Sequence, residues 1–226
     1  SGRLMLCALL DGQSTPEEMA QLAKRKLRSK MGDLALALDG RVDDHHRFML
    51  RMQLDRVEQV ERDIAKLDER IEAKLDPYRA QHQRLMQIPG VDWTGAATII
   101  AELGVDMNVF PTAQHAAAWA GVCPGNNESA GRHKAQPTRK GNIHLTTALV
   151  QAAVCASKKR GCYLKEKYWR LKARRGPKRA AMAIAHKILI AAYHLLAGQQ
   201  DYKDLGPAYL AHLSPETRQR TLPRRL

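Results

Sequence analysis

The sequence predicts an all-α protein, in which a coiled-coil helix precedes a helical domain that contains a helix-hairpin-helix. Two observations lead to this fold class. Apolar residues recur every seven positions in the first third of the chain, and beyond it helical segments alternate with turns marked by glycine. The alternation of apolar and polar residues that is typical of strands is nearly absent from the 226 residues.

Residues 1–42 are predicted to form a connector of short helices. Gly12 ends the first helix, because glycine adopts the backbone conformation that follows a helix at little cost. Ser14 or Thr15 caps the second helix, and Pro16 then occupies an early helical position, where proline is tolerated.

Residues 43–77 carry the pattern of a coiled-coil helix, which ends before Pro77. Its apolar residues lie at seven-residue intervals, with a companion stripe, and charged residues fill the other faces: Leu50, Val57, Ile64 and Ile71, accompanied by Leu54, Val60, Leu67 and Leu75. A continuous helix of this length would span roughly 50 Å. Such a stripe packs either on its own domain or on a second copy of the chain. We therefore expect a homo-oligomer through residues 43–77, with packing inside one chain as the alternative.

The positive charge is confined to the second part of the chain. Residues 1–79 contain 15 Lys and Arg against 15 Asp and Glu, whereas residues 80–226 contain 22 against 8. Between Lys158 and Lys187 there are 12 basic residues and one acid, Glu166. Such a density of charge is typical of a protein that binds nucleic acid. The run opens with three candidate phosphate-binding residues, Lys158, Lys159 and Arg160.

Other classes of partner are disfavoured by the sequence. No apolar run reaches the roughly 18–20 residues of a membrane span, so no membrane partner is expected. The four cysteines share no metal-ligand spacing, which predicts no metal site and a reducing, cytoplasmic location.

A helix-hairpin-helix is predicted around Pro89 and Gly90. Pro89 ends one helix, and Gly90 permits a tight turn that exposes backbone amides next to the start of the following helix. Such amides bind phosphate without reading sequence, which makes Gly90, Val91 and Thr94 candidate nucleic-acid ligands. The carboxylate of Asp92 would repel a phosphate, so a purely structural hairpin is an equal alternative.

The polar loop around Ser129 has the composition required of a nucleophile that attacks a phosphodiester. Ser129 is followed by the small residues Ala130 and Gly131, which leave its hydroxyl accessible. Cations that could neutralise the phosphate follow it in the sequence: Arg132, Lys134, Arg139 and Lys140. Asn142 then precedes an apolar helix, whose first amides could hold a phosphate together with Lys140. An ordinary polar loop of a basic protein is the alternative.

Two further features lie downstream. Tyr163, Tyr168 and Trp169 stand among lysines and arginines and could stack on bases, although such rings more often seal contacts between helices. Residues 206–226 form a basic tail.

The chain resembles the transposases of the insertion-sequence 110/1111 type, whose recombination is guided by a bridge RNA. The resemblance rests on the order of its short motifs, which individually are unspecific: Ile88-Pro89-Gly90-Val91, Ala118-Trp119-Ala120-Gly121-Val122-Cys123-Pro124, Glu128-Ser129-Ala130-Gly131, Thr138-Arg139-Lys140-Gly141-Asn142 and Leu149-Val150-Gln151-Ala152-Ala153. It implies that residues 78–205 form a helical serine transposase domain.

The resemblance also implies the chemistry and the partners. Ser129 would attack DNA and become joined to it through a phosphoserine, with DNA and a bridge-type guide RNA as partners on the bacterial nucleoid. Members of this family carry an amino-terminal RuvC-like domain with four acidic residues that bind magnesium. No such tetrad is found in residues 1–79, so magnesium is expected only together with that domain, and the chain is expected to lack it and to be inactive alone. The alternative is a non-catalytic module of a truncated transposase, which binds nucleic acid and oligomerises.

Overall fold

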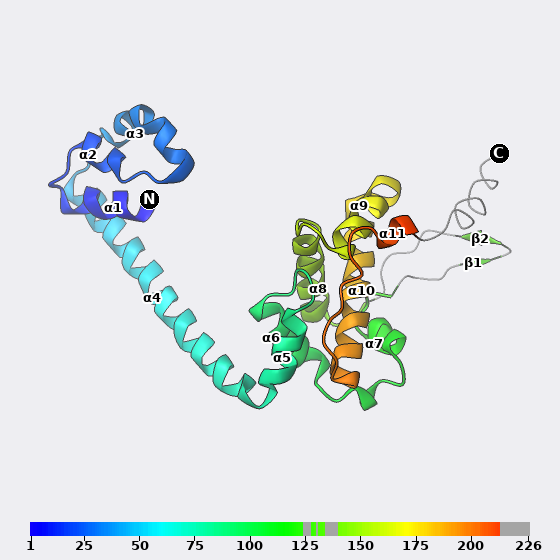
Figure 1. The fold of residues 1–226 in the computed structure, drawn as a ribbon. Coiled ribbons are helices and arrows are strands. Elements are labelled where there is room, and N and C mark those ends of the chain that lie inside the picture. The colour runs from blue at the N-terminus through cyan, green and yellow to red at the C-terminus, as the bar shows by residue number, and fades with distance from the viewer. Residues whose placement is uncertain (124–127, 130, 134–139, 213–226) are drawn as a thin grey trace. The chain divides into compact units, whose positions relative to one another are not determined.

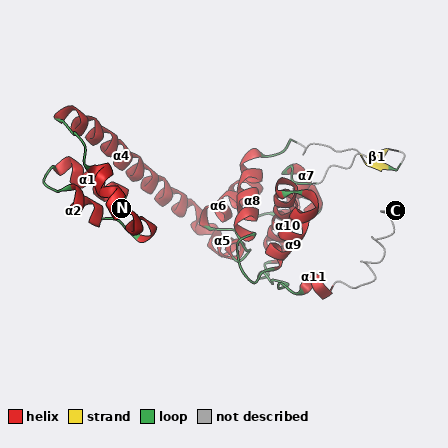
Figure 2. Cartoon of the chain, turned by 90° about the horizontal axis from the view of Figure 1, so that it is seen from above, coloured by secondary structure: helices red, strands yellow, loops and turns green. Residues whose placement is uncertain are grey.

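The computed structural model of the chain describes residues 1–123, 128–129, 131–133 and 140–212. Its secondary structure is helical apart from one hairpin with two residues in each strand, which confirms the predicted all-α class (Figures 1 and 2). Two compact units divide the chain, Ser1–Ala73 and Lys74–Leu226. The predicted boundaries at 42/43, 77/78 and 205/206 remain predictions.

The first unit contains short helices and most of one long helix. In chain order these are α1 (Gly2–Asp11), α2 (Pro16–Gln21), the 3-10 helix η1 (Arg25–Lys30), α3 (Met31–Leu38) and α4 (Asp44–Leu75). The cap of α2 is Thr15, whose side chain accepts a hydrogen bond from the Glu18 amide, while the Glu18 carboxylate accepts one from the Thr15 amide. This reciprocal pair satisfies two amides that would otherwise lack partners.

Helix α1 packs on the amino-terminal part of α4 (Figure 1). The Arg3 guanidinium forms ion pairs with Glu58 at 3.2 Å and Glu61 at 2.7 Å, and Arg47 donates to the Leu9 carbonyl. Leu54, on the same side of the helix, is the only buried residue of α4. One face of α4 is therefore covered within the unit, and the rest of its surface is exposed.

The second unit is built around α10. Its elements are η2 (Asp76–Tyr78), α5 (Arg79–Met86), α6 (Trp93–Leu103), η3 (Met107–Val109), α7 (Ala113–Trp119), β1 (Glu128–Ser129), β2 (Arg132–His133), α8 (Ile143–Ala156), α9 (Tyr163–Arg175), α10 (Pro177–Gly198) and α11 (Tyr209–His212). Helices α5, α7, α8 and α9 all contact α10 (Figure 1). Ile184, Ile188 and Leu189 of α10 are fully buried.

Among the residues that the structure describes, α10 alone is long and apolar enough to cross a membrane by length and composition, and half of that apolar stretch is buried inside the unit. The sequence contains no unbroken apolar run of this length because charged residues such as Lys187 interrupt it.

The chain after α10 returns along the unit. The amide of Tyr202 donates to the Gln87 side chain at 2.7 Å, and Asp204 accepts from the Tyr163 amide at 3.0 Å. Leu210 of α11 is buried in the core, and its carbonyl accepts from Arg170. The start of the predicted tail is thus part of the folded unit, and residues 213–226 lie outside the described residues.

Candidate nucleic-acid interface

Ser129 lies in the β1–β2 hairpin. Its backbone pairs with that of Arg132 in an antiparallel register, and Gly131 takes a φ of +72° in the turn between them. Glycine populates this left-handed region at little cost, which accounts for Gly131 at this position. The hairpin therefore brings the backbone of the predicted nucleophile beside that of one predicted cation. Two other predicted cations, Lys134 and Arg139, lie outside the described residues.

The segment that carries Ser129 begins and ends at one point of the helical unit. A Cβ on Gly141 would lie only 2.6 Å from the Ala120 carbonyl oxygen and would also overlap the Gly121 amide nitrogen. The Thr146 hydroxyl donates to the same Ala120 carbonyl at 2.6 Å. Segment 122–140 is consequently closed at its base by backbone contact, which joins the end of α7 to the start of α8.

Asn142 fixes the second end of this segment. Its side-chain oxygen accepts from the Leu145 amide at 3.0 Å and so caps α8, while its side-chain nitrogen donates to Glu102 of α6 at 2.5 Å. Both ends of the amide are therefore engaged within the fold, so the geometry assigns Asn142 a structural role, and its contact with phosphate stays a prediction. Lys140, two residues earlier, is exposed.

The turn between α5 and α6 packs against α8. A Cβ on Gly90, where φ is +92°, would lie 2.6 Å from the Ala156 amide nitrogen, and the Val91 amide donates to the Ile88 carbonyl at 3.0 Å. Asp92 caps α6 by accepting from the Gly95 amide at 2.8 Å. Packing thus explains Gly90 directly, the Val91 amide is already used, and the helix-hairpin-helix and its phosphate contacts stay predictions.

Thr94, the third candidate of this turn, is exposed in the first turn of α6. Its carbonyl accepts a hydrogen bond from the Thr98 hydroxyl at 2.9 Å, and its own side chain is open to solvent.

The turn between α8 and α9 presents three cations to solvent. Lys158, Lys159 and Arg160 are all exposed, and the Lys158 and Lys159 amides close the turn by donating to Cys155 and Ala156. In the part of the second unit that the structure describes, the one ion pair joins Arg79 to Asp76. No ion pair within the described residues therefore engages these three cations.

A second group of exposed cations, which the sequence analysis did not name as a site, surrounds the corner between α9 and α10. Gly176 alone joins the two helices, with a φ of +79°. The last turn of α9 and the first turn of α10 place four cations around it: Arg174, Arg175, Lys178 and Arg179. Cations disfavour the start of a helix, so two of them in the first turn of α10 are unexpected on stability grounds. The sequence signal that could have identified this group is the run of basic residues from Lys158 to Lys187, which contains all four cations.

Only one of the three aromatic candidates is available for stacking. Tyr163 and Tyr168 are buried, whereas Trp169 is 48% exposed. The Trp169 indole donates to the Ser157 carbonyl at 3.1 Å, and the Lys172 ammonium lies 4.1 Å from the centre of its ring. Trp169 is therefore held against the base of the Lys158–Arg160 turn, next to the cations.

No group of three or more His, Cys, Asp or Glu side chains comes together as a metal site within the described ranges. Glu102, whose carboxylate lies at the base of the serine segment, already accepts a hydrogen bond from Asn142. The described residues therefore offer no set of side chains that fits a magnesium ion.

The structure describes an all-α domain with exposed cations at the Lys158–Arg160 turn and at the corner between α9 and α10, as is typical of proteins that bind nucleic acid. Residues 82–169 match the family described as "Transposase IS116/IS110/IS902 family". The matched stretch runs from α5 into α9 and includes both Ser129 and the Lys158–Arg160 turn.

Two curated relatives are also named as transposases. One, y4pF/y4sB of Sinorhizobium fredii, is 29% identical over 145 residues, which cover 62% of this chain and 37% of that protein. The other, the transposase for insertion sequence element IS1111A of Coxiella burnetii, is 30% identical over 125 residues, which cover 54% of this chain and 34% of that protein. The aligned part of the chain spans little more than a third of the length of these relatives.

Proposed function

We propose that this chain is the DNA-binding and strand-transferring part of a transposase, and that it supplies Ser129 as the nucleophile for DNA cleavage and exchange guided by a bridge RNA. One observation carries the proposal. The segment that bears Ser129 is closed at its base by the Gly121–Gly141 contact, and α8, which starts there, leads to the exposed Lys158–Arg160 turn. In this proposal, α8 connects the segment of the nucleophile to the phosphate-binding turn.

In the proposed reaction, the Ser129 Oγ forms a bond to a DNA phosphorus, and the bond from that phosphorus to one strand oxygen breaks. The proton of the serine goes to a base, and the leaving oxygen takes up a proton. The phosphoserine ester conserves the energy of the broken bond, so that a hydroxyl of a new strand can attack it and release the serine. Serine needs such activation because its hydroxyl is a weak nucleophile.

The base and any metal ion that activate Ser129 are proposed to come from outside the described residues, since these contain no fitting acidic cluster. Arg132, which belongs to the hairpin, and Lys140, which follows it in the sequence, would offset charge on the phosphate during the attack. The cations from Lys158 onward would hold the DNA and guide-RNA backbones by contacts that carry no sequence information. Such a protein would act on the bacterial nucleoid.

A second part of the proposal is self-association through α4. Leu54, a member of the predicted companion stripe, is buried and faces α1. The remaining apolar stripe, from Val57 to Ile71, is centred about 100° around the helix from it. Its members are roughly half exposed and uncovered by the rest of the first unit: Val57, Val60, Ile64, Leu67 and Ile71. The stripe has the heptad spacing of a coiled coil, so a second copy of α4 would bury it.

Trapping of a covalent protein–DNA adduct tests the catalytic proposal. The chain is incubated with a nicked DNA substrate, magnesium and an acidic RuvC-like domain in trans, and the adduct is detected after denaturation. The adduct should form with the wild-type chain and with Ser29→Ala, and disappear in Ser129→Ala. Ser29 is a suitable control because its hydroxyl bonds only the Lys26 carbonyl in the first unit.

The alternative function is a non-catalytic module that binds nucleic acid and oligomerises. It is favoured by the exposed cations of the second unit, because binding of nucleic acid by these side chains needs no nucleophile. If no adduct forms with all components present, while the chain still binds nucleic acid, this alternative replaces the first.

A further inference from the structure

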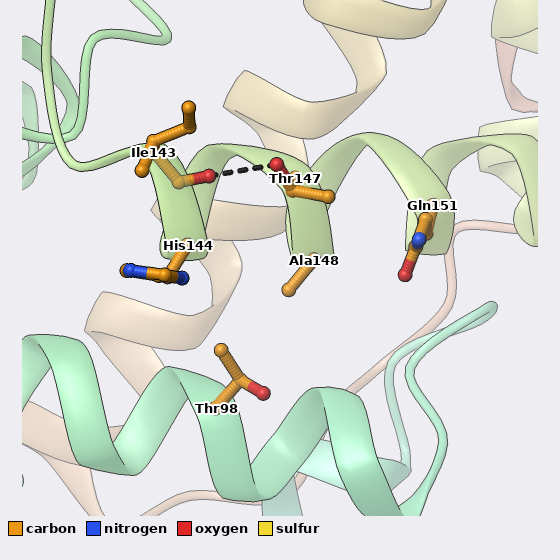
Figure 3. A pocket seen from close by; sticks show the side chains of 6 residues that line it. All are labelled: Thr98, Ile143, His144, Thr147, Ala148 and Gln151. Atoms are coloured by element: carbon orange, nitrogen blue, oxygen red, sulfur yellow. Dashed lines mark hydrogen bonds between the residues drawn. The ribbon is translucent and has the colours of Figure 1, made fainter.

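A groove separates α6 from the exposed side of α8. It has a volume of about 430 Å³ and is lined by Thr98 of α6 and by residues on two successive turns of α8: Ile143, His144, Thr147, Ala148 and Gln151. Figure 3 shows that His144, Ala148 and Gln151 point from α8 toward α6, and that Thr98 points back toward them. The groove exists because Thr98 and Ala148 are too small to fill the space between the helices.

The polar groups of the groove are not equally available. The hydroxyls of Thr98 and Thr147 donate to their own helix, at 2.9 Å to Thr94 and 2.7 Å to Ile143, so their oxygens can only accept. The His144 ring and the Gln151 amide are exposed and have no hydrogen-bond partner in the described part of the chain. The groove thus offers a planar ring and a free amide, about 10 Å apart along one helix face.

The groove lies between cations that flank the two ends of α8. Lys140 precedes α8 at the end where Asn142 fixes the serine segment, and Lys158 and Lys159 follow it at the other end. The sequence contains no acid from Ser129 to Lys165. Helix α8 is roughly 21 Å long, which is about the length of six nucleotides in one strand. A strand whose phosphates contact both ends of α8 would pass over the groove.

We propose that the α6–α8 groove is a subsite for an unpaired nucleobase of a nucleic-acid strand that runs along α8. The base stacks on the His144 ring, and its edge pairs with the Gln151 amide, which can donate and accept as base edges do. Ile143, which is 72% exposed at the mouth of the groove, supplies an apolar contact. The volume of the groove is within the range of small-molecule sites. The inference rests on the proposed nucleic-acid function and adds a contact that reads the base rather than the phosphate.

The test compares two single-stranded probes, an oligothymidylate of roughly 12 nucleotides and the same backbone with abasic sites. Wild-type chain should bind the oligothymidylate about 10-fold more tightly, because stacking and pairing need a base. Thr98→Phe, which fills the groove, and Gln151→Leu, which removes the amide, should abolish this preference while leaving the affinity for the abasic probe unchanged. Gln114→Leu, an exposed glutamine on α7, is the matched control.

Three outcomes overturn the inference. The first is equal affinity of the wild-type chain for both probes. The second is a preference for the oligothymidylate that survives in Gln151→Leu. This variant leaves α8 intact, so it remains informative even if Thr98→Phe is unstable. A photocrosslink from 5-iodouracil that maps outside α6 and α8 would also contradict it. Failure of wild-type chain to bind either probe would instead refute the nucleic-acid function itself. A parallel oligouridylate arm shows whether the base comes from DNA or RNA.

Discussion

Gly121 and Gly141 touch through their backbones at the two ends of the segment that carries Ser129. A side chain on Gly141 would overlap the Gly121 nitrogen and would lie 2.6 Å from the Ala120 carbonyl oxygen. The contact therefore allows no Cβ at position 141, and it sets where the serine segment leaves and rejoins the helical unit.

Gly141→Ala should lower the free energy of unfolding by about 1–3 kcal/mol, since backbone must move to admit the methyl group. Gly198→Ala is the control, because a Cβ there would meet only the Gln200 side chain at 3.7 Å. Urea denaturation followed by circular dichroism measures both. An unchanged urea midpoint for Gly141→Ala would contradict the close backbone contact between Gly121 and Gly141.

The two hydrogen bonds of Asn142 can be separated by substitution. Asn142→Ser keeps a cap for α8 and loses the bond to Glu102, whereas Asn142→Ala loses both and should cost about 1 kcal/mol more. Asn142→Asp keeps the cap but sets one carboxylate against another. It should be less stable than Asn142→Ser at pH 7, and the gap should close as the pH falls toward about 4, where one carboxylate takes up a proton. Thermal melts of the three variants between pH 7 and pH 4 determine the order of their stabilities.

The exposed cations predict a strong salt dependence of binding. If roughly 6–10 phosphates are neutralised, affinity should fall about 10³–10⁵-fold between 50 and 200 mM salt. Lys158→Glu with Lys159→Glu should weaken binding to unrelated sequences alike and reduce the slope of log affinity against log salt by about 2. Lys24→Glu with Lys26→Glu makes the same charge change in the first unit and should alter the slope far less. Fluorescence anisotropy gives the slopes, and a flat response of wild-type chain would refute backbone binding.

The apolar stripe of α4 predicts a concentration-dependent oligomer. Ile64→Glu should shift the chain to monomer in sedimentation, because a buried charge would replace a heptad contact. Glu69→Lys, on an exposed face away from the stripe, should sediment as wild type. Wild-type chain that remains monomeric at high concentration would exclude the α4 interface.

Burial, assisted by the charge of Lys187, lowers the pKa of His186 below its ordinary value of 6.5. The unfolded chain therefore binds this proton more tightly than the folded chain. The contribution of neutral His186 to the free energy of unfolding is therefore fully present above about pH 6.5. It is lost as the pH falls through the lowered pKa.

The Nδ1 atom of His186 is buried without a hydrogen-bond partner in the described part of the chain. His186→Leu should raise the free energy of unfolding by about 1 kcal/mol and flatten its dependence on pH between 5 and 7. His194→Leu, an exposed position of the same helix, should keep the wild-type pH dependence. A steeper pH dependence in His186→Leu would contradict this account.

Local interactions were predictable from the residues themselves. The heptad of residues 43–77 predicted a long helix, and α4 runs from Asp44 to Leu75. The choice between Ser14 and Thr15 as cap depended on one hydrogen bond, which the structure gives to Thr15. Each of these features involves residues within one or two turns of each other, whose spacing a sequence displays.

The roles of Gly90 and Asn142 could not be predicted in this way. Gly90 was interpreted as a turn that exposes amides, yet its open side is filled by the backbone of α8. Asn142 was interpreted as a phosphate ligand, yet its amide joins α8 to Glu102 of α6. Both partners are 40 or more positions away in the sequence, so no local pattern announces them.

By itself, therefore, the sequence determined the helical class, the concentration of positive charge after residue 79 and the likeness to a family of transposases, because these depend on composition and on short-range order. The tertiary structure alone decided which glycines pack against backbone, which cations remain unpaired and which side chains of α6 and α8 face a common groove. The physical reason is that these depend on close contacts between helices that are brought together only when the core around α10 forms.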